Sequence, residues 1–341
     1  LEDEYTMRPI VVLLGEMYDP DAEALLAEHA EVRRADPEDA GAVSRALADA
    51  HGVVARYPAR IDAGVLACAP HLLAVLSSGR GVDNIDVPAA TAAGVVVANN
   101  PGLGGQPVSE HALGLLIMVT RDLAAVARHG IEGAWERRLT TRRVELGGSV
   151  LGIVGLGNVG GSVARRASAG FGARVLAYDP YVPAERMAEV GATKVDELGA
   201  LLEQADFVSA HPELNDETEG MFDDAAFARM KPGAYFVNTS RGRVVDTDAL
   251  VRALRSGHLA GAALDVYEQE PLPAGSPLTG MDNVVLSAHV ADFTVQTKRK
   301  LAFSAATKLL DALAGVCPPS ALNPRVWDTV ERRRGELLAS A

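Results

Sequence analysis

The stretch SVLGIVGLGNVGGSVARRAS, residues 149–168, decides the fold. Its pattern predicts a strand at Val150–Val154, a turn containing three glycines, and a helix at Val159–Ser168. A Gly-x-Gly-x-x-Gly pattern alone is a weak signal, but between a strand and a helix it is typical of a turn that binds a dinucleotide. A βαβ unit is therefore expected here.

Each glycine of the turn has a physical task. Gly155 allows the tight turn, Gly157 lets the backbone approach a pyrophosphate, and Gly160 permits close packing of helix on strand. The helix N-terminus offers N–H donors and the positive end of its dipole to the phosphates. The turn residues expected to bind the dinucleotide are Gly155, Gly157, Asn158, Val159 and Gly160.

An aspartate completes this motif. The next expected strand, Arg174–Tyr178, is followed by Asp179, which lies 19 residues past Gly160. Its carboxylate can accept hydrogen bonds from both hydroxyls of an adenosine ribose, and it would repel a 2′-phosphate. We therefore expect NAD rather than NADP as the cofactor. The alternative is a glycine-rich turn followed by an ordinary surface aspartate.

Short β-branched runs alternate with helical stretches along most of the chain. The strands expected in the C-terminal block are Val150–Val154, Arg174–Tyr178, Asp206–Ala210, Ala234–Asn238, Gly261–Val266 and Val284–Ala288. Those expected in the N-terminal block are Pro9–Leu14, Val53–Tyr57, Leu72–Ser77 and Val95–Ala98. This order predicts an α/β protein with parallel, doubly wound sheets covered by helices.

Two expected helices stand out. Val108–Leu123 is apolar all round at its centre, which is typical of a helix buried on every side, either in a core or between subunits; we favour the interface. Thr294–Leu313 has no strand after it, so it is expected to pack on the N-terminal block. A tail rich in proline and asparagine follows.

Composition limits the function. The 341 residues correspond to roughly two domains. With 32 Lys+Arg against 45 Asp+Glu, the net charge of -13 opposes general nucleic-acid binding. No apolar run approaches the ~18 residues of a membrane span. Cys68 and Cys317, 249 residues apart, form neither a metal-binding spacing nor a disulfide framework, so a cytoplasmic location is expected and no metal site.

Three side chains are candidates for chemistry. Arg241 follows the strand that ends near Asn238, where a planar, permanently charged guanidinium suits a carboxylate or a polarised carbonyl; a surface arginine that caps a helix fits the spacing equally well. His289 follows the last strand. Paired with a carboxylate such as Glu270, it can exchange a proton with an alcohol oxygen while hydride moves to a nicotinamide. The sequence holds eight histidines, and only its position singles out His289.

The glycine turn, the Arg241 loop, Glu270 and His289, in this order, resemble the D-isomer-specific 2-hydroxyacid dehydrogenase family. That family includes phosphoglycerate dehydrogenase, glyoxylate and hydroxypyruvate reductases, D-lactate dehydrogenase and formate dehydrogenase. The resemblance covers nearly the whole chain. Further matching motifs are Gly81-Val82-Asp83-Asn84-Ile85-Asp86, Ser109-Glu110-His111, Met230-Lys231-Pro232-Gly233, Gly261-Ala262-Ala263-Leu264-Asp265-Val266 and Ser287-Ala288-His289.

The resemblance implies roles for individual residues. Arg241 holds the substrate's carboxylate and carbonyl, His289 is the general acid/base, and Glu270 pairs with it; formate dehydrogenases carry glutamine there. Asp265 faces the nicotinamide end. The further cofactor contacts implied are His211, Thr218, Thr239, Ser240 and Asp265. Gly79, Arg80 and Gly81 belong to the loop that receives the substrate carboxylate.

The resemblance also implies the domain organisation. A flavodoxin-like substrate domain, 1–106 and 292–341, receives an inserted Rossmann NAD-binding domain, 107–291. The helix Val108–Leu123 lies where family members form their dimer, so a homodimer is expected.

The sequence departs from the family pattern at several places. Ala291 and Asp292 stand where Gly-Gly is common, and His211-Pro212-Glu213 replaces His-Val-Pro. Arg80 replaces a small or apolar residue. The run Arg137, Arg138, Arg142 and Arg143 is either a solvated loop or, with Arg80, a receptor for a second anionic group.

The sequence therefore predicts an NAD-dependent dehydrogenase that moves a hydride between nicotinamide and C2 of a small anionic D-2-hydroxy or 2-keto acid. Within the same chemistry, a phosphorylated or phosphonate substrate is the rival. From another class, the rival is an NAD-sensing binding protein like the family's corepressors. The sequence names neither the substrate nor the direction of the reaction.

Overall fold

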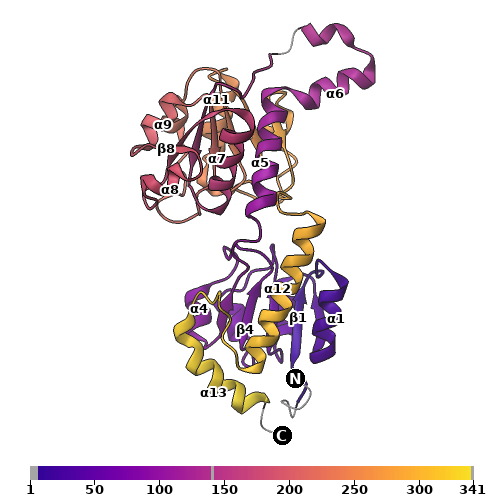
Figure 1. Cartoon of the computed structure of the whole chain (residues 1–341). Helices are drawn as coiled ribbons and strands as arrows, with labels where there is room; N and C mark the ends of the chain where they lie inside the picture. The colour runs from indigo at the N-terminus through magenta and orange to yellow at the C-terminus, as the bar shows by residue number, and fades with distance from the viewer. Residues whose placement is uncertain (1–6, 140–141, 339–341) are drawn as a thin grey trace. The chain divides into compact units, whose positions relative to one another are not determined.

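The fold is described from a computed structural model, in which residues 7–139 and 142–338 are described (Figure 1). The chain divides into two compact units. The first runs up to Gly104 and resumes at Thr294, and the second comprises Gly105–Phe293. The boundaries expected from the sequence lie two residues from these at each crossing, which places Asp292 in the second unit rather than in the first.

The first unit is a five-stranded parallel sheet in the order β2-β1-β3-β4-β5, the flavodoxin-like order, and confirms that prediction. Its strands are β1 (Ile10–Leu14), β2 (Glu31–Ala35), β3 (Gly52–Ala55), β4 (Ala74–Ser77) and β5 (Val96–Ala98). Its helices are α1 (Pro20–His29), α2 (Ala40–Leu47), α3 (Ala63–Ala67), α4 (Val87–Ala92), α12 (Val295–Ala314) and α13 (Trp327–Leu338).

The returning helix α12 completes the core of the first unit. It packs against α1, β3 and β4, as expected of a last helix without a strand of its own. Arg299 on α12 pairs with Asp19 and Asp21 at the start of α1. Beyond it, Asn323 accepts a hydrogen bond from the backbone N–H of Val97 at 2.8 Å, which joins the C-terminal segment to β5.

Two elements of this unit depart from the sequence prediction. The edge strand β2 reads EVRRA and buries none of its five residues, so it carried no apolar pattern. The expected tail rich in proline and asparagine instead ends in helix α13, whose charged sequence contains only Val330 and Leu338 as buried residues.

The second unit is a seven-stranded parallel sheet in the order β12-β11-β10-β9-β6-β7-β8, a Rossmann arrangement as predicted. Its strands are β6 (Val150–Val154), β7 (Arg174–Tyr178), β8 (Ala192–Lys194), β9 (Phe207–Ala210), β10 (Ala234–Asn238), β11 (Leu259–Leu264) and β12 (Val284–Leu286). Its helices are α5 (Gly105–Thr120), α6 (Leu123–Glu132), α7 (Asn158–Phe171), α8 (Ala184–Ala188), α9 (Leu198–Gln204), α10 (Asp224–Arg229) and α11 (Thr247–Arg255). All six strands expected here are present, and the three-residue edge strand β8 was missed.

Helix α5 is packed inside its own unit. It contacts α7, β10 and β11, and Ala112, Leu113 and Leu116 on it are buried. Four exposed large apolar side chains, Leu123, Ile131, Trp135 and Leu139, follow it. They lie on α6, which buries none of its residues and extends away from the sheet of this unit, and on a 3₁₀ turn at Trp135–Leu139 (Figure 1).

In the part of the chain that the structure describes, no helix combines the length and apolar character needed to cross a membrane.

Candidate active site

Most predicted site residues of the second unit follow the carboxyl ends of its strands. In the order of the sheet, they follow β12 (His289), β11 (Asp265), β10 (Thr239, Ser240, Arg241), β9 (His211), β6 (Gly155) and β7 (Asp179). The strand order reverses between β9 and β6, and ligands of open parallel sheets bind at such a point. The fold thus aligns residues from 155 to 289 along the side of the sheet where the strands have their carboxyl ends, which is called the edge below.

The glycine turn has the geometry of a dinucleotide cradle. Gly155 has a φ of +86°, and a Cβ there would lie 2.7 Å from the backbone N of Pro212. A Cβ on Gly160 would lie 2.1 Å from the carbonyl oxygen of Gly155. A Cβ on Gly157 would meet nothing within 4 Å, so the backbone there is open to a ligand. These are the tasks expected of the three glycines.

The start of α7 and Asp179 fit the same group. Gly157 is the N-cap residue and offers no side-chain acceptor, so the first amides of the helix face the open turn. The carboxylate of Asp179 accepts from the backbone N–H of Leu156 at 2.8 Å and of Tyr181 at 3.0 Å. These bonds fix the carboxylate beside the glycine turn and leave it further lone pairs for ribose hydroxyls.

The His211 side chain lies in the middle of this edge. Its Nε2 lies 2.8 Å from Ser209 Oγ and its Nδ1 lies 3.4 Å from Thr239 Oγ1. Burial lowers the pKa of His211 to about 3, so the ring is neutral at neutral pH. By contrast, the hydroxyl of Thr218 bonds to Glu213 and Asn215 of its own loop.

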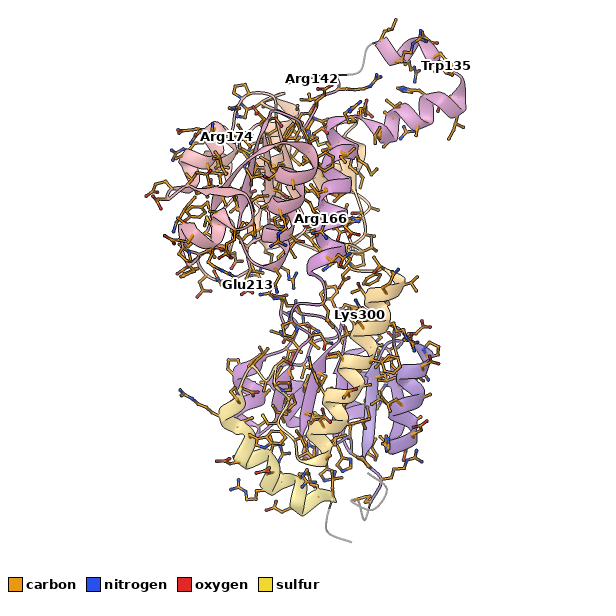
Figure 2. All side chains as sticks on the ribbon, viewed as in Figure 1. Trp135, Arg142, Arg166, Arg174, Glu213 and Lys300 are labelled. Atoms are coloured by element: carbon orange, nitrogen blue, oxygen red, sulfur yellow. The ribbon has the colours of Figure 1, made fainter. Side chains whose placement is uncertain are left out.

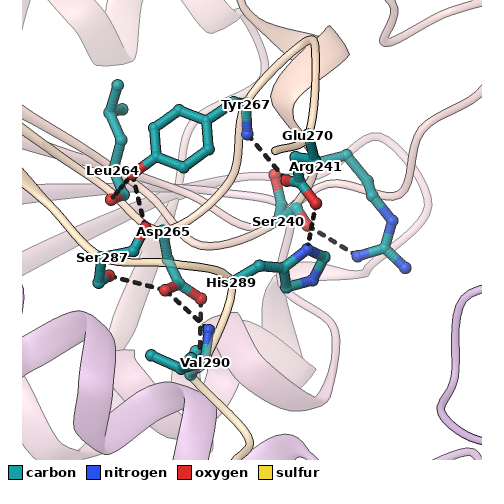
Figure 3. Close-up of polar contacts among 10 residues, drawn as sticks. Ser240, Arg241, Leu264, Asp265, Tyr267, Glu270, Ser287, His289 and Val290 are labelled. Carbon is teal, nitrogen blue, oxygen red and sulfur yellow. Dashed lines mark hydrogen bonds and ion pairs between the residues drawn. The ribbon is translucent and has the colours of Figure 1, made fainter. Parts of the chain in front are cut away.

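The proposed acid/base pair is formed at the β12 end. His289 has a φ of +51°, uncommon for a residue with a side chain, and its Nδ1 lies 2.6 Å from Glu270 Oε2 (Figure 3). Glu270 Oε1 accepts from the backbone N–H of Tyr267 at 3.0 Å. Since a carboxylate only accepts, Nδ1 carries the proton and Nε2 is the nitrogen available for exchange. Burial alone would lower the pKa of His289, but the hydrogen bond and charge of Glu270 raise it.

Asp265 anchors the turn that carries His289. It is 0% exposed, and its carboxylate accepts from Ser287 Oγ at 2.7 Å and from the N–H groups of Val290 and Ala291 at 3.0 Å each. Burial alone would raise the pKa of Asp265; hydrogen bonds from His111 and Ser287 and the two amides lower it. Its backbone carbonyl also accepts from the N–H of His289 at 2.8 Å.

The Arg241 loop is held by Asn238. The amide of Asn238 donates to the Arg241 carbonyl at 2.9 Å and accepts from the backbone N–H of Ser240 at 2.9 Å. The half-buried guanidinium of Arg241 donates to the Ser240 carbonyl at 2.7 Å. A Cβ on Gly242 would lie 1.8 Å from the backbone of Tyr267, so this loop packs directly on the segment leading to Glu270. Arginine, glutamate and histidine therefore share one end of the edge.

Comparison with known proteins agrees with this geometry. Residues 113–291 match the family model of the D-isomer specific 2-hydroxyacid dehydrogenase, NAD binding domain. The chain is 38% identical over 285 residues to a glyoxylate reductase of Thermofilum pendens, covering 83% of this chain and 84% of that protein. It is 39% identical over 313 residues to a D-3-phosphoglycerate dehydrogenase of Mycobacterium bovis, covering 92% and 58%. The crystal structure of holo D-mandelate dehydrogenase from Rhodotorula graminis superposes with a TM-score of 0.82, at 30% identity, covering 92% of this chain and 97% of that one.

The chain belongs to the D-isomer specific 2-hydroxyacid dehydrogenase family. The second unit of this family member is its NAD-binding domain, in agreement with the sequence prediction. The chain spans 58% of the length of the mycobacterial phosphoglycerate dehydrogenases that it matches.

The predicted substrate loop of this dehydrogenase-family chain belongs to the first unit. It follows β4 and is held by its neighbours: Ser77 Oγ donates to the Gly81 carbonyl at 2.7 Å, and Asn99 donates to the Arg80 carbonyl at 2.7 Å. A Cβ on Gly79 would meet nothing within 4 Å. The loop is thus fixed through its carbonyls, and the side chain of Arg80 is exposed. Its contact with substrate stays a prediction.

Two arginines of the arginine run have partners outside the proposed acid/base pair. Arg138 stacks on Trp135, with its Cζ 5.9 Å from the ring centre. Arg142 lines a cavity of about 380 Å³ with Lys231 and Tyr235, at the amino ends of β9 and β10. Figure 2 shows Arg142 at the end of this unit opposite Glu213. Arg142 therefore lies away from the carboxyl ends of the strands within this unit, and the role of the arginine run with Arg80 in receiving a second anionic group stays a prediction.

Several residues that organise this family site were not predicted as site residues. Asn238 fixes the Arg241 loop, and Ser287 and His111 contact Asp265. The sequence contains the motifs Ser109-Glu110-His111 and Ser287-Ala288-His289, but nothing in their spacing shows that His111 and Ser287, 176 residues apart, lie in contact. Asp292, the departure after the histidine, is half-buried and faces His289 and Arg241; burial raises its pKa, opposed by the charge of His289.

Proposed function

We propose that this chain is an NAD-dependent dehydrogenase that transfers a hydride between nicotinamide and C2 of a D-2-hydroxy acid or 2-keto acid. The observation that carries the proposal is the pairing of His289 with Glu270 at 2.6 Å, on the strand edge that also carries the dinucleotide cradle. A binding protein needs the cradle, but it does not need a histidine of raised pKa at its end.

The chain's own residues divide the work. NAD, when bound, supplies the hydride acceptor or, as NADH, the donor. In the reductive direction, His289 gives the Nε2 proton to the substrate oxygen, and Glu270 stabilises the charged imidazole before that transfer. Arg241 binds the substrate carboxylate and polarises the carbonyl. The buried charge of Asp265 holds the turn beneath His289.

We assign the preference between dinucleotides to Asp179. Its carboxylate is fixed next to the glycine turn by two backbone amides, so it cannot swing away without losing both bonds. A 2′-phosphate placed there would meet a like charge. NAD is therefore the proposed cofactor in preference to NADP.

The substrate is proposed as a small anionic 2-hydroxy or 2-keto acid, with Gly79, Arg80 and Gly81 as further binding residues. A phosphorylated or phosphonate substrate stays the rival, supported by the exposed Arg80. Arg80→Ala tests this rival. An equal loss of kcat/KM for substrates with and without a second anionic group would contradict a special role of Arg80 in anion binding. The cytoplasmic location also stays a prediction; Cys68 and Cys317 are free thiols.

We also propose a homodimer formed through the segment of α6 and the turn after it. Ile131 is 88% exposed, Trp135 68% and Leu139 80%, an apolar group that a second copy of the chain would cover. Light scattering should give twice the chain mass for the parent and a smaller mass for Trp135→Asp. A monomeric parent would overturn this assembly.

The first experiment follows NADH absorbance with glyoxylate, hydroxypyruvate, phosphohydroxypyruvate and small phosphonates. Oxidation of NADH with any of them establishes the dehydrogenase. Binding of NADH without oxidation across the panel would favour the alternative of an NAD-sensing, corepressor-like protein.

A further inference from the structure

A hydrogen-bond network of three polar side chains lies behind the turn that carries His289. His111 on α5 places its Nε2 3.0 Å from Ser287 Oγ and 3.5 Å from Asp265 Oδ1. Ser287 Oγ in turn lies 2.7 Å from Asp265 Oδ1. The three residues come from separate elements: α5, the end of β12 and the end of β11. None of them is part of the proposed acid/base pair.

The donor and the acceptor of each hydrogen bond in this network can be assigned. Asp265 can only accept, so the single hydroxyl proton of Ser287 points to its carboxylate. Ser287 Oγ must then accept from His111, which therefore carries its proton on Nε2. The side chain of His111 is 27% exposed and that of Asp265 1%, so the carboxylate has little water to replace a lost donor.

Asp265 connects this network to the backbone of His289. Its two carboxylate oxygens accept from the N–H groups of Val290 and Ala291, and its carbonyl accepts from that of His289. His289 is held at a φ of +51°, a conformation that the surrounding contacts must maintain. The ring of His289 reaches Glu270 from this backbone position.

The geometry points to His111 as a positioning residue for His289, acting through Ser287 and Asp265. Its donation to Ser287 fixes the hydroxyl on Asp265, and this fixes the carboxylate under the turn. The inference rests on the proposed function for its kinetic consequences, but not for its structural ones. The charged and titratable groups that face His289 are Glu270, Arg241, Asp265 and Asp292.

Two measurements on the full-length chain test this inference. In His111→Ala, the turn loosens and the Glu270 contact weakens, so kcat should fall about tenfold while KM for NADH stays within about twofold. The pKa of His289, followed by NMR of the histidine rings, should fall by about half a unit or more. Glu110→Gln, an exposed neighbour on α5, is the control and should change neither.

Two further variants separate positioning from a general effect on folding. His111→Gln can still donate to Ser287 and should restore both kcat and the pKa of His289. Ser287→Ala should lower kcat and the pKa of His289 as much as His111→Ala does. The double variant should lower them no further than either single variant, because both substitutions break the same hydrogen-bond network. A His289 pKa unchanged in His111→Ala would overturn the inference, even where kcat falls with Tm. No turnover by the parent would overturn the proposed function instead, and the NMR titration would still decide the role of His111.

Discussion

Two histidines on the same strand edge have opposite environments. His211 follows β9 and His289 follows β12, and the shortest side-chain contact of each ring is 2.8 Å and 2.6 Å, respectively. The partner of His211 is the neutral hydroxyl of Ser209, and burial lowers its pKa to about 3. The partner of His289 is the carboxylate of Glu270, which raises its pKa against the lowering effect of partial burial, with 45% of the side chain exposed. Chain position relative to the sheet is thus similar, and the neighbour decides what each ring can do.

This difference gives the two positions, the middle of the edge and its β12 end, different tasks. A histidine that stays neutral can fill space and form hydrogen bonds beside a dinucleotide, but it cannot hold a proton for transfer at neutral pH. A histidine of raised pKa can hold one. We therefore expect the proton chemistry at the β12 end, and cofactor binding at the ends of β9, β6 and β7.

The largest effect is expected from exchanging the rings for inert side chains. His289→Ala should lower kcat about 10²- to 10⁴-fold with little change in the Kd of NADH, because it removes the proton donor and leaves the cradle intact. His211→Asn is the matched variant. It should change kcat far less and act mainly on the Kd of NADH. Stopped-flow turnover with fluorescence titration of NADH checks both, and equal kcat losses would break the comparison.

A smaller effect is expected when only the partner changes. Glu270→Gln keeps the shape of the partner and removes its charge, so the pKa of His289 should fall and kcat should drop about tenfold near neutral pH. In the reductive direction, the loss should grow as pH rises, since less imidazole is protonated. A pH profile of NADH oxidation checks this. A profile with the parent's midpoint would show that Glu270 does not set the charge of His289.

Asp179 tests the other end of the edge. Asp179→Ala removes the carboxylate expected to repel a 2′-phosphate, so the ratio of kcat/KM for NADPH over NADH should rise about tenfold. The same variant should leave the pH midpoint of the reaction unchanged. Asp216→Ala, an exposed carboxylate elsewhere in this unit, is the control. If the parent already prefers NADPH, the assignment of Asp179 is wrong.

The sequence predicted most of the fold because buried strands carry their own pattern. The runs Val150–Val154 and Ala234–Asn238, apolar except for Asn238, match β6 and β10 residue for residue. Where the pattern was absent, prediction failed: β2 buries none of its residues, β8 reads ATK and buries only its alanine, and half of the residues of α13 are charged.

The candidate site divides in the same way. Residues that act through the backbone, such as Gly155 and Gly160, were found from spacing because a turn is local. The role of His289 came from the resemblance and from its place after a strand. The hydrogen-bond network of His111, Ser287 and Asp265 joins three separate elements, and only folding brings these residues together.

The last prediction concerns stability in acid rather than turnover. The pKa of His211 is about 3 in the folded chain and about 6.5 when unfolded, so below about pH 6.5 the unfolded chain binds a proton that the folded chain does not. The free energy of unfolding should therefore fall as pH drops from 6.5 towards 3. His289 has the opposite sign: its raised pKa adds stability below about pH 6.5, which is lost as pH rises through its folded value. Urea unfolding at several pH values should show a shallower loss in acid for His211→Asn than for the parent. His289→Asn should lack the gain in stability that the parent shows as pH falls through the raised pKa of His289 towards 6.5. Parallel curves for the parent and His211→Asn would mean that the buried ring is not held neutral, and the contrast between the two histidines would then rest on Glu270 alone.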